Sequence, residues 1–229
     1  MTRASALRTS PVAALLSKLR SDFRPVAGMA TAARVDDAAR AFETLAIVDL
    51  SCLQRFGVKG SQAEGVLRAL GVALPSEANS WVALKGDGLV ARLGRSEFLV
   101  EDGAEGSTVA RVRGALENEA TTGVYAVPRQ DLALALTGPP VSELFAQTCS
   151  FDLHEFERKP NLTVMTMMME VSVTLVAGEL AGRPGFRVWC DGTFGTYFYE
   201  RLLEITVELG GGAAGICDLY PEARALAAA

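Results

Sequence analysis

The chain has 229 residues, of which 49% are hydrophobic and 21% are charged, and its mean hydropathy is +0.22. This length and composition predict one large globular domain or two small ones and exclude global disorder. The net charge of −5 argues against a nucleic-acid-binding protein, because phosphate recognition needs a basic surface.

Residues 1–34 differ in composition from the rest of the chain. They are rich in Ala, Ser and Arg and hold six basic side chains against the single acid Asp22. This pattern predicts a basic N-terminal tail over residues 1–34 that contacts an acidic partner, with an organellar transit peptide as the alternative. No apolar run of signal-peptide type follows the basic residues, so we do not expect secretion.

Residues 35–125 are predicted to form a first α+β half. In chain order, we expect a helix at 36–45, strands at 46–49 and 55–59, a helix at 61–71, strands at 81–84, 89–93 and 97–100, and a helix at 107–119. Ser61-Gln62-Ala63-Glu64 has the capping-box pattern, and Gly71 is placed to end its helix in a left-handed conformation.

Residues 126–215 are predicted to form a second half on the same plan, followed by a C-terminal tail at 216–229. We expect a strand at 132–137, a short helix ending at 147, strands within 162–177 and at 185–190, and a helix from 191 to 210. The last helix places apolar residues on one stripe: Phe194, Phe198, Leu202, Ile205 and Leu209. The repeated plan indicates an α+β fold of two related halves.

The stretch 162–177 is low in charge, but it is too short for a membrane helix and rich in Val and Thr. We therefore expect strands there and no membrane-spanning helix. Residues 210–215 match G-x-G-x-x-G as a string, but a helix precedes them and only 14 residues follow. We interpret them as a flexible glycine-rich exit from the last helix.

No catalytic or metal-binding constellation is found in the sequence. The four cysteines, Cys52, Cys149, Cys190 and Cys217, are widely spaced, which is typical of reduced thiols in a cytoplasmic protein. The single histidine, His154, lies in an acidic stretch that predicts a solvated loop. We therefore expect no metal site and no catalytic residue in this chain.

Several strings nevertheless resemble a known family. Residues 49–60 read DLSCLQRFGVKG, and further strings follow at 75–81, 92–99, 127–131, 136–139, 149–153 and 185–188. In this order, over about residues 45–210, they resemble the gamma subunit of heterotetrameric sarcosine oxidase. The wider superfamily is that of the folate-binding aminomethyltransferase, the T-protein of glycine cleavage, whose fold agrees with the doubled α+β plan.

This resemblance implies a small accessory subunit of a cytoplasmic complex that oxidatively demethylates sarcosine or a related N-methyl amino acid such as N-methylglutamate. The complex would use FAD, FMN, NAD and tetrahydrofolate, carried mainly by larger alpha and beta flavoprotein subunits, with a small delta subunit as a further partner. This chain would bind no cofactor alone, and neither nucleic acid nor membrane is an expected partner. The alternative function is a free-standing folate-binding protein or aminomethyltransferase-like enzyme.

Five residues are candidates for partner contact or for lining a pocket. Arg55, Lys59, Arg129 and Gln130 could line a folate-like pocket or anchor a partner, since the planar guanidinium of an arginine suits carboxylate recognition. Internal ion pairing of the charged members is the alternative. Trp81 is a candidate apolar anchor in the core or at an interface.

Overall fold

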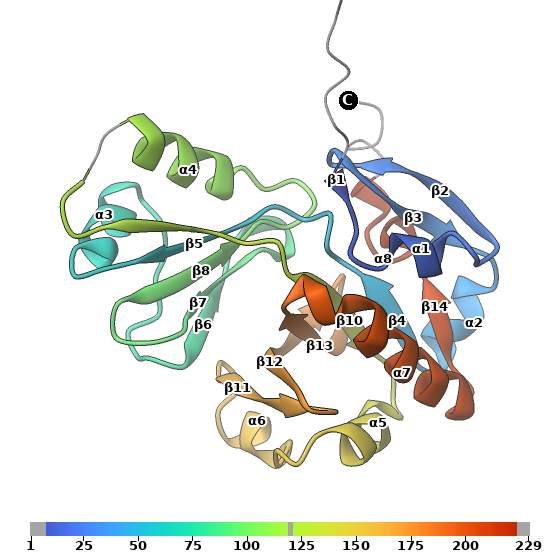
Figure 1. Ribbon diagram of the computed structural model, residues 1–229. Coiled ribbons are helices and arrows are strands. Elements are labelled where there is room, and N and C mark those ends of the chain that lie inside the picture. Colours follow the sequence, from blue (N-terminus) through green and yellow to red (C-terminus); the bar gives the residue numbers. More distant parts are fainter. Residues whose placement is uncertain (1–7, 119–120, 224–229) are drawn as a thin grey trace, which may run out of the picture.

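The computed structural model describes residues 8–118 and 121–223, which form three β-sheets and their covering helices (Figure 1). None of the described helices is long and apolar enough to cross a membrane. The two larger sheets pack against each other, and the hollow described below lies between them and the smallest sheet.

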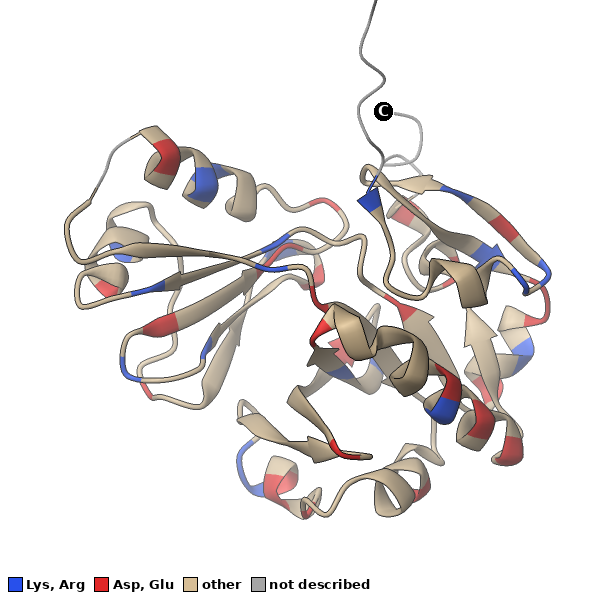
Figure 2. Ribbon diagram, viewed as in Figure 1, with Lys and Arg blue, Asp and Glu red and all other residues tan. Residues whose placement is uncertain are grey.

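The smallest sheet is built from residues that were expected to be a tail. Its strand order is β1-β3-β2, with β1 at Arg8–Thr9, β2 at Ser21–Val26 and β3 at Met29–Val35, and the short helix α1 at Ala13–Leu16 precedes β2. The predicted tail over 1–34 is therefore corrected for residues 8–34, while residues 1–7 lie outside the described part. Composition misled because the basic residues among 8–34, blue in Figure 2, have exposed or partly exposed side chains, whereas Val12, Leu16 and Val26 are buried.

The largest sheet has six strands in the order β11-β12-β13-β10-β4-β14. Their bounds are Thr163–Met168, Val171–Leu180, Arg183–Cys190, Leu132–Thr137, Ala46–Asp49 and Gly212–Ala214. All neighbours are antiparallel except β14 and β4, which are parallel. Helices α5 (Val141–Thr148), α6 (His154–Arg158) and α7 (Gly195–Glu208) share one apolar cluster with this sheet through Phe145, Phe156 and Phe198.

The third sheet has five antiparallel strands in the order β6-β7-β8-β5-β9. Their bounds are Ser80–Ala83, Leu89–Arg92, Glu97–Glu101, Arg55–Lys59 and Tyr125–Pro128. Helices α3 (Ala63–Ala69) and α4 (Thr108–Asn118) cover one face through an apolar cluster that includes Val58, Leu67 and Val112.

The other face of the five-stranded sheet packs against the six-stranded sheet. Leu89 and Leu99 share one buried cluster with Val176 and Trp189 of the larger sheet. Helices α2 (Ala38–Glu43) and α8 (Ile216–Leu219) contribute Ala38 and Ile216 to the same cluster. The two short 3-10 helices are η1 (Lys85–Asp87) and η2 (Gly192–Phe194).

The sheets do not follow the sequence boundary predicted at 125/126. β4 lies in the predicted first half, but it pairs with β10 of the second half. β9 (Tyr125–Pro128) lies almost wholly in the predicted second half, but it pairs with β5 of the first half in the five-stranded sheet. The chain therefore crosses twice between the two sheets, and these crossings bring the start of β5 and the end of β9 to the junction.

Most local predictions are confirmed at the level of elements. β4, β5 and β10 begin and end where expected, Gly71 and Gly210 have positive φ angles beyond helix ends, and 162–177 contains a hairpin that turns at Met169 and Glu170. His154 is exposed as predicted, with a 72% exposed side chain, but it begins helix α6 and does not lie in a loop. All four cysteines are free.

Four local predictions are corrected. No side chain caps α3, so the capping-box prediction is wrong. Phe194 is 50% exposed rather than buried, because it lies in η2 before the helix begins. The glycine-rich exit is not a loose segment: Gly212–Ala214 is strand β14. The C-terminal tail begins later than predicted, since Tyr220 and Ala223 are buried, and residues 224–229 lie outside the described part.

Candidate functional site

An open hollow of about 710 Å³ lies where the three sheets meet. Residues at the edge of the smallest sheet, at the start of β5, in the β9–β10 connection and in the turn before α7 line it. They include Arg8, Pro11, Met29, Ser51, Arg55, Val127, Arg129, Gln130, Asp131 and Asp191.

Arg55 forms part of the base of this hollow and is almost completely buried. Its Nε donates to Glu101 Oε2 at 2.8 Å, and its terminal nitrogens donate to the backbone oxygens of Leu50, Ser51 and Asp131. Every part of the guanidinium is therefore engaged within the chain. This arrangement fixes Arg55 as a structural group.

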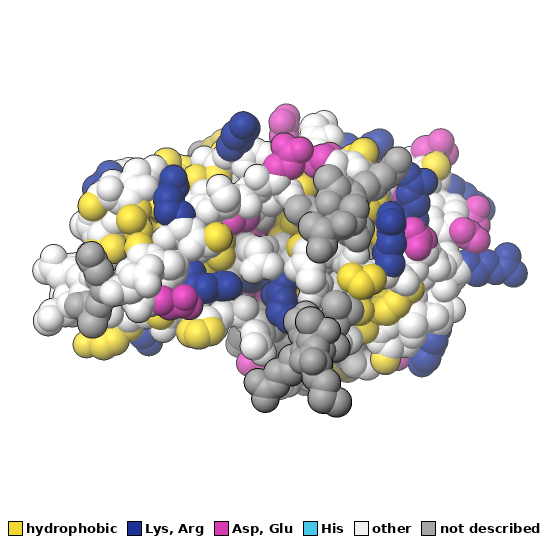
Figure 3. Space-filling view, turned by 90° about the horizontal axis from the view of Figure 1, so that it is seen from above, with side chains coloured by type: hydrophobic (Ala, Val, Ile, Leu, Met, Phe, Trp, Pro, Cys, Tyr) yellow, Lys and Arg dark blue, Asp and Glu magenta, His cyan; other side chains and the backbone are white. Residues whose placement is uncertain are grey.

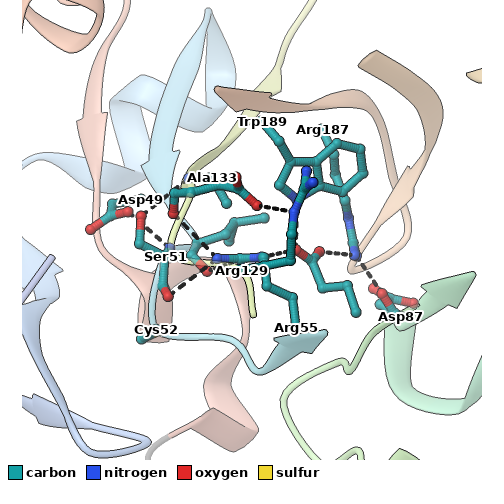
Figure 4. Close-up of polar contacts among 12 residues, drawn as sticks. Asp49, Ser51, Cys52, Arg55, Asp87, Arg129, Ala133, Arg187 and Trp189 are labelled. Carbon is teal, nitrogen blue, oxygen red and sulfur yellow. Dashed lines mark hydrogen bonds and ion pairs between the residues drawn. The ribbon is translucent and has the colours of Figure 1, made fainter. Parts of the chain in front are cut away.

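Glu101 is the centre of a buried polar network behind the hollow. Its carboxylate accepts a hydrogen bond from Arg55, a second from Arg187 Nη1 at 2.8 Å, and a third from the Trp189 indole at 2.7 Å. Arg187 also donates to the backbone oxygen of Asp87 and to the Tyr220 hydroxyl. Figure 4 shows Arg187 and Trp189 on one side of this polar network and Arg55 on the other.

The charges of this network stabilise one another. Burial alone would raise the pKa of Glu101, but the adjacent guanidiniums of Arg55 and Arg187 and the Trp189 donor hold that pKa below its ordinary value. Burial would lower the pKa of Arg187, but Glu101 and Tyr220 raise it. Glu101 and Arg187 are therefore both charged at neutral pH, and Glu101 has no free role as an acid or base.

Asp49, at the end of β4, anchors the smallest sheet to the junction. Its Oδ2 accepts hydrogen bonds from Ser10 Oγ at 2.6 Å and from Thr31 Oγ1 at 3.1 Å. Its Oδ1 accepts from the Ser51 backbone N–H at 2.9 Å, while Ser51 Oγ accepts from the Ala133 N–H. These contacts hold Arg8 and Thr9 at the edge of the hollow.

The hollow brings together three of the five candidate residues. Arg55, Arg129 and Gln130 line it, and Arg129 Nε pairs with Asp131 Oδ2 at 2.9 Å. Lys59 lies exposed at the far end of β5, beside Glu97 and Tyr125 of the neighbouring strands. Trp81 lines a separate cavity of about 250 Å³ and packs on Gly178.

Sequence reasoning missed the residues that complete the junction. Arg8 was assigned to a tail, Arg187 was read only as a strand residue, and Glu101 was left just beyond the strand predicted at 97–100. A charged residue in an otherwise apolar strand, such as Glu101 after Phe98-Leu99-Val100, is the one signal that could have identified the network.

The described residues contain no cluster of His, Cys, Asp and Glu side chains able to hold a metal ion. Two of the four thiols are also unsuited to nucleophilic chemistry. Burial, with Asp49 nearby, raises the pKa of Cys52 to about 12, and burial near Asp131 and Asp191 raises that of Cys190 to about 12. Both thiols are protonated at neutral pH and therefore inert.

Comparison with known proteins supports the fold. Scans against protein-family models and curated proteins found no match. Among solved structures, the chain is similar to the glycine cleavage aminomethyltransferase T from Bartonella henselae, with a TM-score of 0.65 and 17% identity over 86% of this chain. It is equally similar to a chain of the heterotetrameric sarcosine oxidase from Corynebacterium sp. U-96, with a TM-score of 0.65 and 21% identity over 90% of this chain.

These matches confirm the predicted fold class, an α+β fold of two related halves of the aminomethyltransferase T-protein type. The two matches differ in coverage. The chain spans 57% of the aminomethyltransferase but 98% of the sarcosine oxidase chain.

Proposed function

We propose that this chain is an accessory subunit, of the gamma type, in a hetero-oligomeric complex that oxidatively demethylates sarcosine or a related N-methyl amino acid. The observation that carries the proposal is the coverage: the chain corresponds to nearly the whole of one chain of a heterotetrameric sarcosine oxidase, but to little more than half of an aminomethyltransferase. The sequence strings between residues 49 and 188 support the same assignment.

The chemistry of the junction favours a supporting role. Three of its buried charged groups are paired with one another: Glu101 forms ion pairs with both Arg55 and Arg187. Such a network positions the two sheets, and none of its three charged groups is free to donate or accept a proton. In the proposed complex, flavin on the larger subunits would accept hydride from the N-methyl carbon, and tetrahydrofolate would take the one-carbon unit.

The two carboxylates that line the hollow are engaged within the chain. That of Asp131 is paired with Arg129, and that of Asp191 accepts from the backbone N–H and hydroxyl of Thr193. A pterin presents amino and ring N–H donors, for which the hollow offers the Gln130 carboxamide but no unengaged carboxylate. We therefore assign the cofactors to partner subunits, in a complex located in the cytoplasm.

Purification of the tagged chain from its native host, followed by an assay of what accompanies it, tests the proposal. We expect co-purification of larger subunits with bound flavin and demethylation of sarcosine or N-methylglutamate by the complex. The chain alone should show no such turnover. A partner-free monomer from native extract, or demethylation by the purified chain alone, would contradict the assignment.

The alternative of a free-standing folate-binding protein has its own test. Tetrahydrofolate titrated into the isolated chain by calorimetry should give no binding heat under the accessory-subunit proposal. Saturable binding with one site per chain would favour the alternative instead.

A further inference from the structure

The hollow at the junction is richer in basic than in acidic groups, although the chain as a whole has a net charge of −5. Its lining has three guanidiniums, those of Arg8, Arg55 and Arg129, against the carboxylates of Asp131 and Asp191. Figure 3 views the molecule from above and shows basic side chains near the centre of this face. The charge of this surface is thus complementary to an acidic group.

Two of the three guanidiniums keep free donors. Arg8 donates only to the backbone oxygens of Ala27, at 3.2 Å, and Cys52, at 3.4 Å, and it pairs with no carboxylate among the described residues. Arg129 uses its Nε for Asp131, and its terminal nitrogens form no hydrogen bond with another described residue. The Gln130 carboxamide is likewise without a hydrogen-bond partner in the described part of the chain.

The free donors are held in place before anything binds. Arg8 lies in β1 opposite Met29 of β3. The hydrogen bond from Ser10 Oγ to Asp49 holds the segment that follows β1. Arg129 is fixed by its ion pair with Asp131. A guanidinium that is already ordered loses little conformational entropy when it binds a carboxylate, so such a site binds more tightly than a mobile arginine.

The dimensions of the hollow favour a peptide over a single small anion. A volume of about 710 Å³ holds several side chains, and Pro11, Met29 and Val127 provide apolar walls beside the polar donors. Gln130 can bond a peptide backbone group, since a carboxamide both donates and accepts. An acidic side chain flanked by apolar ones would satisfy both kinds of lining.

We propose that this hollow receives an acidic segment of a partner subunit, with a carboxylate of that segment bound between Arg8 and Arg129. The inference rests on the proposed function, because it assigns the partner contact of an accessory subunit to a particular surface. Arg55 holds the segment that carries Arg129 in place through its hydrogen bond to the Asp131 backbone oxygen.

Binding of a probe peptide to the full chain tests the site directly. The probe is a fluorescent, end-capped tetraglutamyl peptide measured by anisotropy, with the tetraglutaminyl peptide as its uncharged match. We expect saturable binding of the glutamyl peptide, and at least a tenfold weaker affinity, as an order-of-magnitude figure, after Arg8→Ala combined with Arg129→Ala. Binding should also weaken as salt is raised.

Arg95→Ala is the matched control. Arg95 is an exposed arginine in the β7–β8 turn, at the end of the five-stranded sheet away from the hollow. This variant should bind as the unaltered chain does. Equal affinity in the double variant, or equal binding of the glutaminyl peptide, would overturn the proposal. Competition by free glutarate at the same molar concentration as the peptide would also overturn it, in favour of a small-molecule carboxylate site.

Assembly in the native complex separates this inference from the assignment of function. If the unaltered chain co-purifies with flavoprotein subunits and the Arg8→Ala, Arg129→Ala chain no longer does, both are supported. If both chains co-purify equally, the accessory role stands and the docking site is wrong. If neither chain recovers a flavoprotein but the unaltered chain binds the glutamyl peptide through Arg8 and Arg129, the assignment of function fails instead.

Discussion

Glu101 and Trp189 lie in different sheets and are joined by a hydrogen bond of 2.7 Å between the indole Nε1 and the carboxylate Oε2. Glu101 is fully buried, and the same carboxylate pairs with Arg187 of the larger sheet and with Arg55 of its own. One carboxylate therefore fixes how the two sheets meet, and with them the position of the hollow. A buried group with three charged or polar partners is costly to lose, since each partner would be left without its bond.

Glu101→Gln should strongly destabilise the fold. The amide keeps the shape of the side chain but leaves the guanidiniums of Arg55 and Arg187 buried without a counter-charge. We expect the free energy of unfolding to fall by about 3–5 kcal/mol in urea denaturation. Glu97→Gln, on the partly exposed end of the same strand, should change it by less than about 0.5 kcal/mol. Similar small effects of both substitutions would contradict a central role for this network.

The same carboxylate predicts the acid sensitivity of the protein. Burial would raise the pKa of Glu101, but Arg55 and Arg187 lower it below that of the unfolded chain. The stabilisation is therefore fully present above the unfolded-state pKa of about 4.3 and is lost as pH falls through the lower folded-state pKa. Urea midpoints measured from neutral pH into this acid range should fall, and Glu101→Gln should show a shallower decline. Parallel declines for the two chains would assign the acid sensitivity to other groups.

The sequence predicted the helices and strands better than it predicted which of them pair in the folded chain. β10 was expected at its observed bounds because Leu132–Thr137 is an apolar run bounded by turn signals. Its pairing with β4, more than 80 residues earlier, has no local signal. The same holds for the ion pair between Glu101 and Arg187, which joins residues 86 positions apart. Three residues that line the hollow, Arg55, Arg129 and Gln130, were named from the sequence by residue type. Arg8 was not, because the basic composition of residues 1–34 gave no sign of the sheet that positions it.

Strand β14 shows a different reason for failure. Glycine has a low preference for strands, so Gly210–Gly215 predicts a loose segment. The structure instead uses these glycines to bring the chain close to β4: a Cβ on Gly211 would lie 2.0 Å from the Leu45 carbonyl oxygen. Close approach of backbones is a property of the folded molecule, and no pattern along the chain expresses it.

Asp49→Ala should loosen the smallest sheet. It removes the acceptor for Ser10, Thr31 and the Ser51 N–H, and these buried donors would then lack partners. We expect a loss of about 1–3 kcal/mol in the free energy of unfolding and faster amide hydrogen exchange in β1 and β3. Asp22→Ala, which breaks an exposed pair with Arg24 in the same sheet, is the control and should cost under about 0.5 kcal/mol. Unchanged exchange in β1 would show that this segment is held by other contacts.

Two glycine-to-alanine substitutions should have opposite effects. In Gly211→Ala the new methyl group meets the Leu45 backbone, so β14 must move away from β4, and we expect a loss of at least about 2 kcal/mol. In Gly114→Ala the methyl group meets nothing within 4 Å, and Gly114 lies inside helix α4. Alanine there lowers the entropy of the unfolded chain, so stability should rise by about 0.5–1 kcal/mol.

Thermal or urea denaturation of the two single variants beside the unaltered chain measures both effects. Because the substitutions are chemically identical, a difference in sign reports the surroundings of each glycine and not the alanine itself. A tolerated alanine at position 211 would mean that β14 does not lie against the Leu45 backbone, and the glycine-rich segment would then be the loose exit that its composition suggests. A destabilising alanine at position 114 would mean that α4 contacts a neighbour through this face, because helix propensity alone favours alanine.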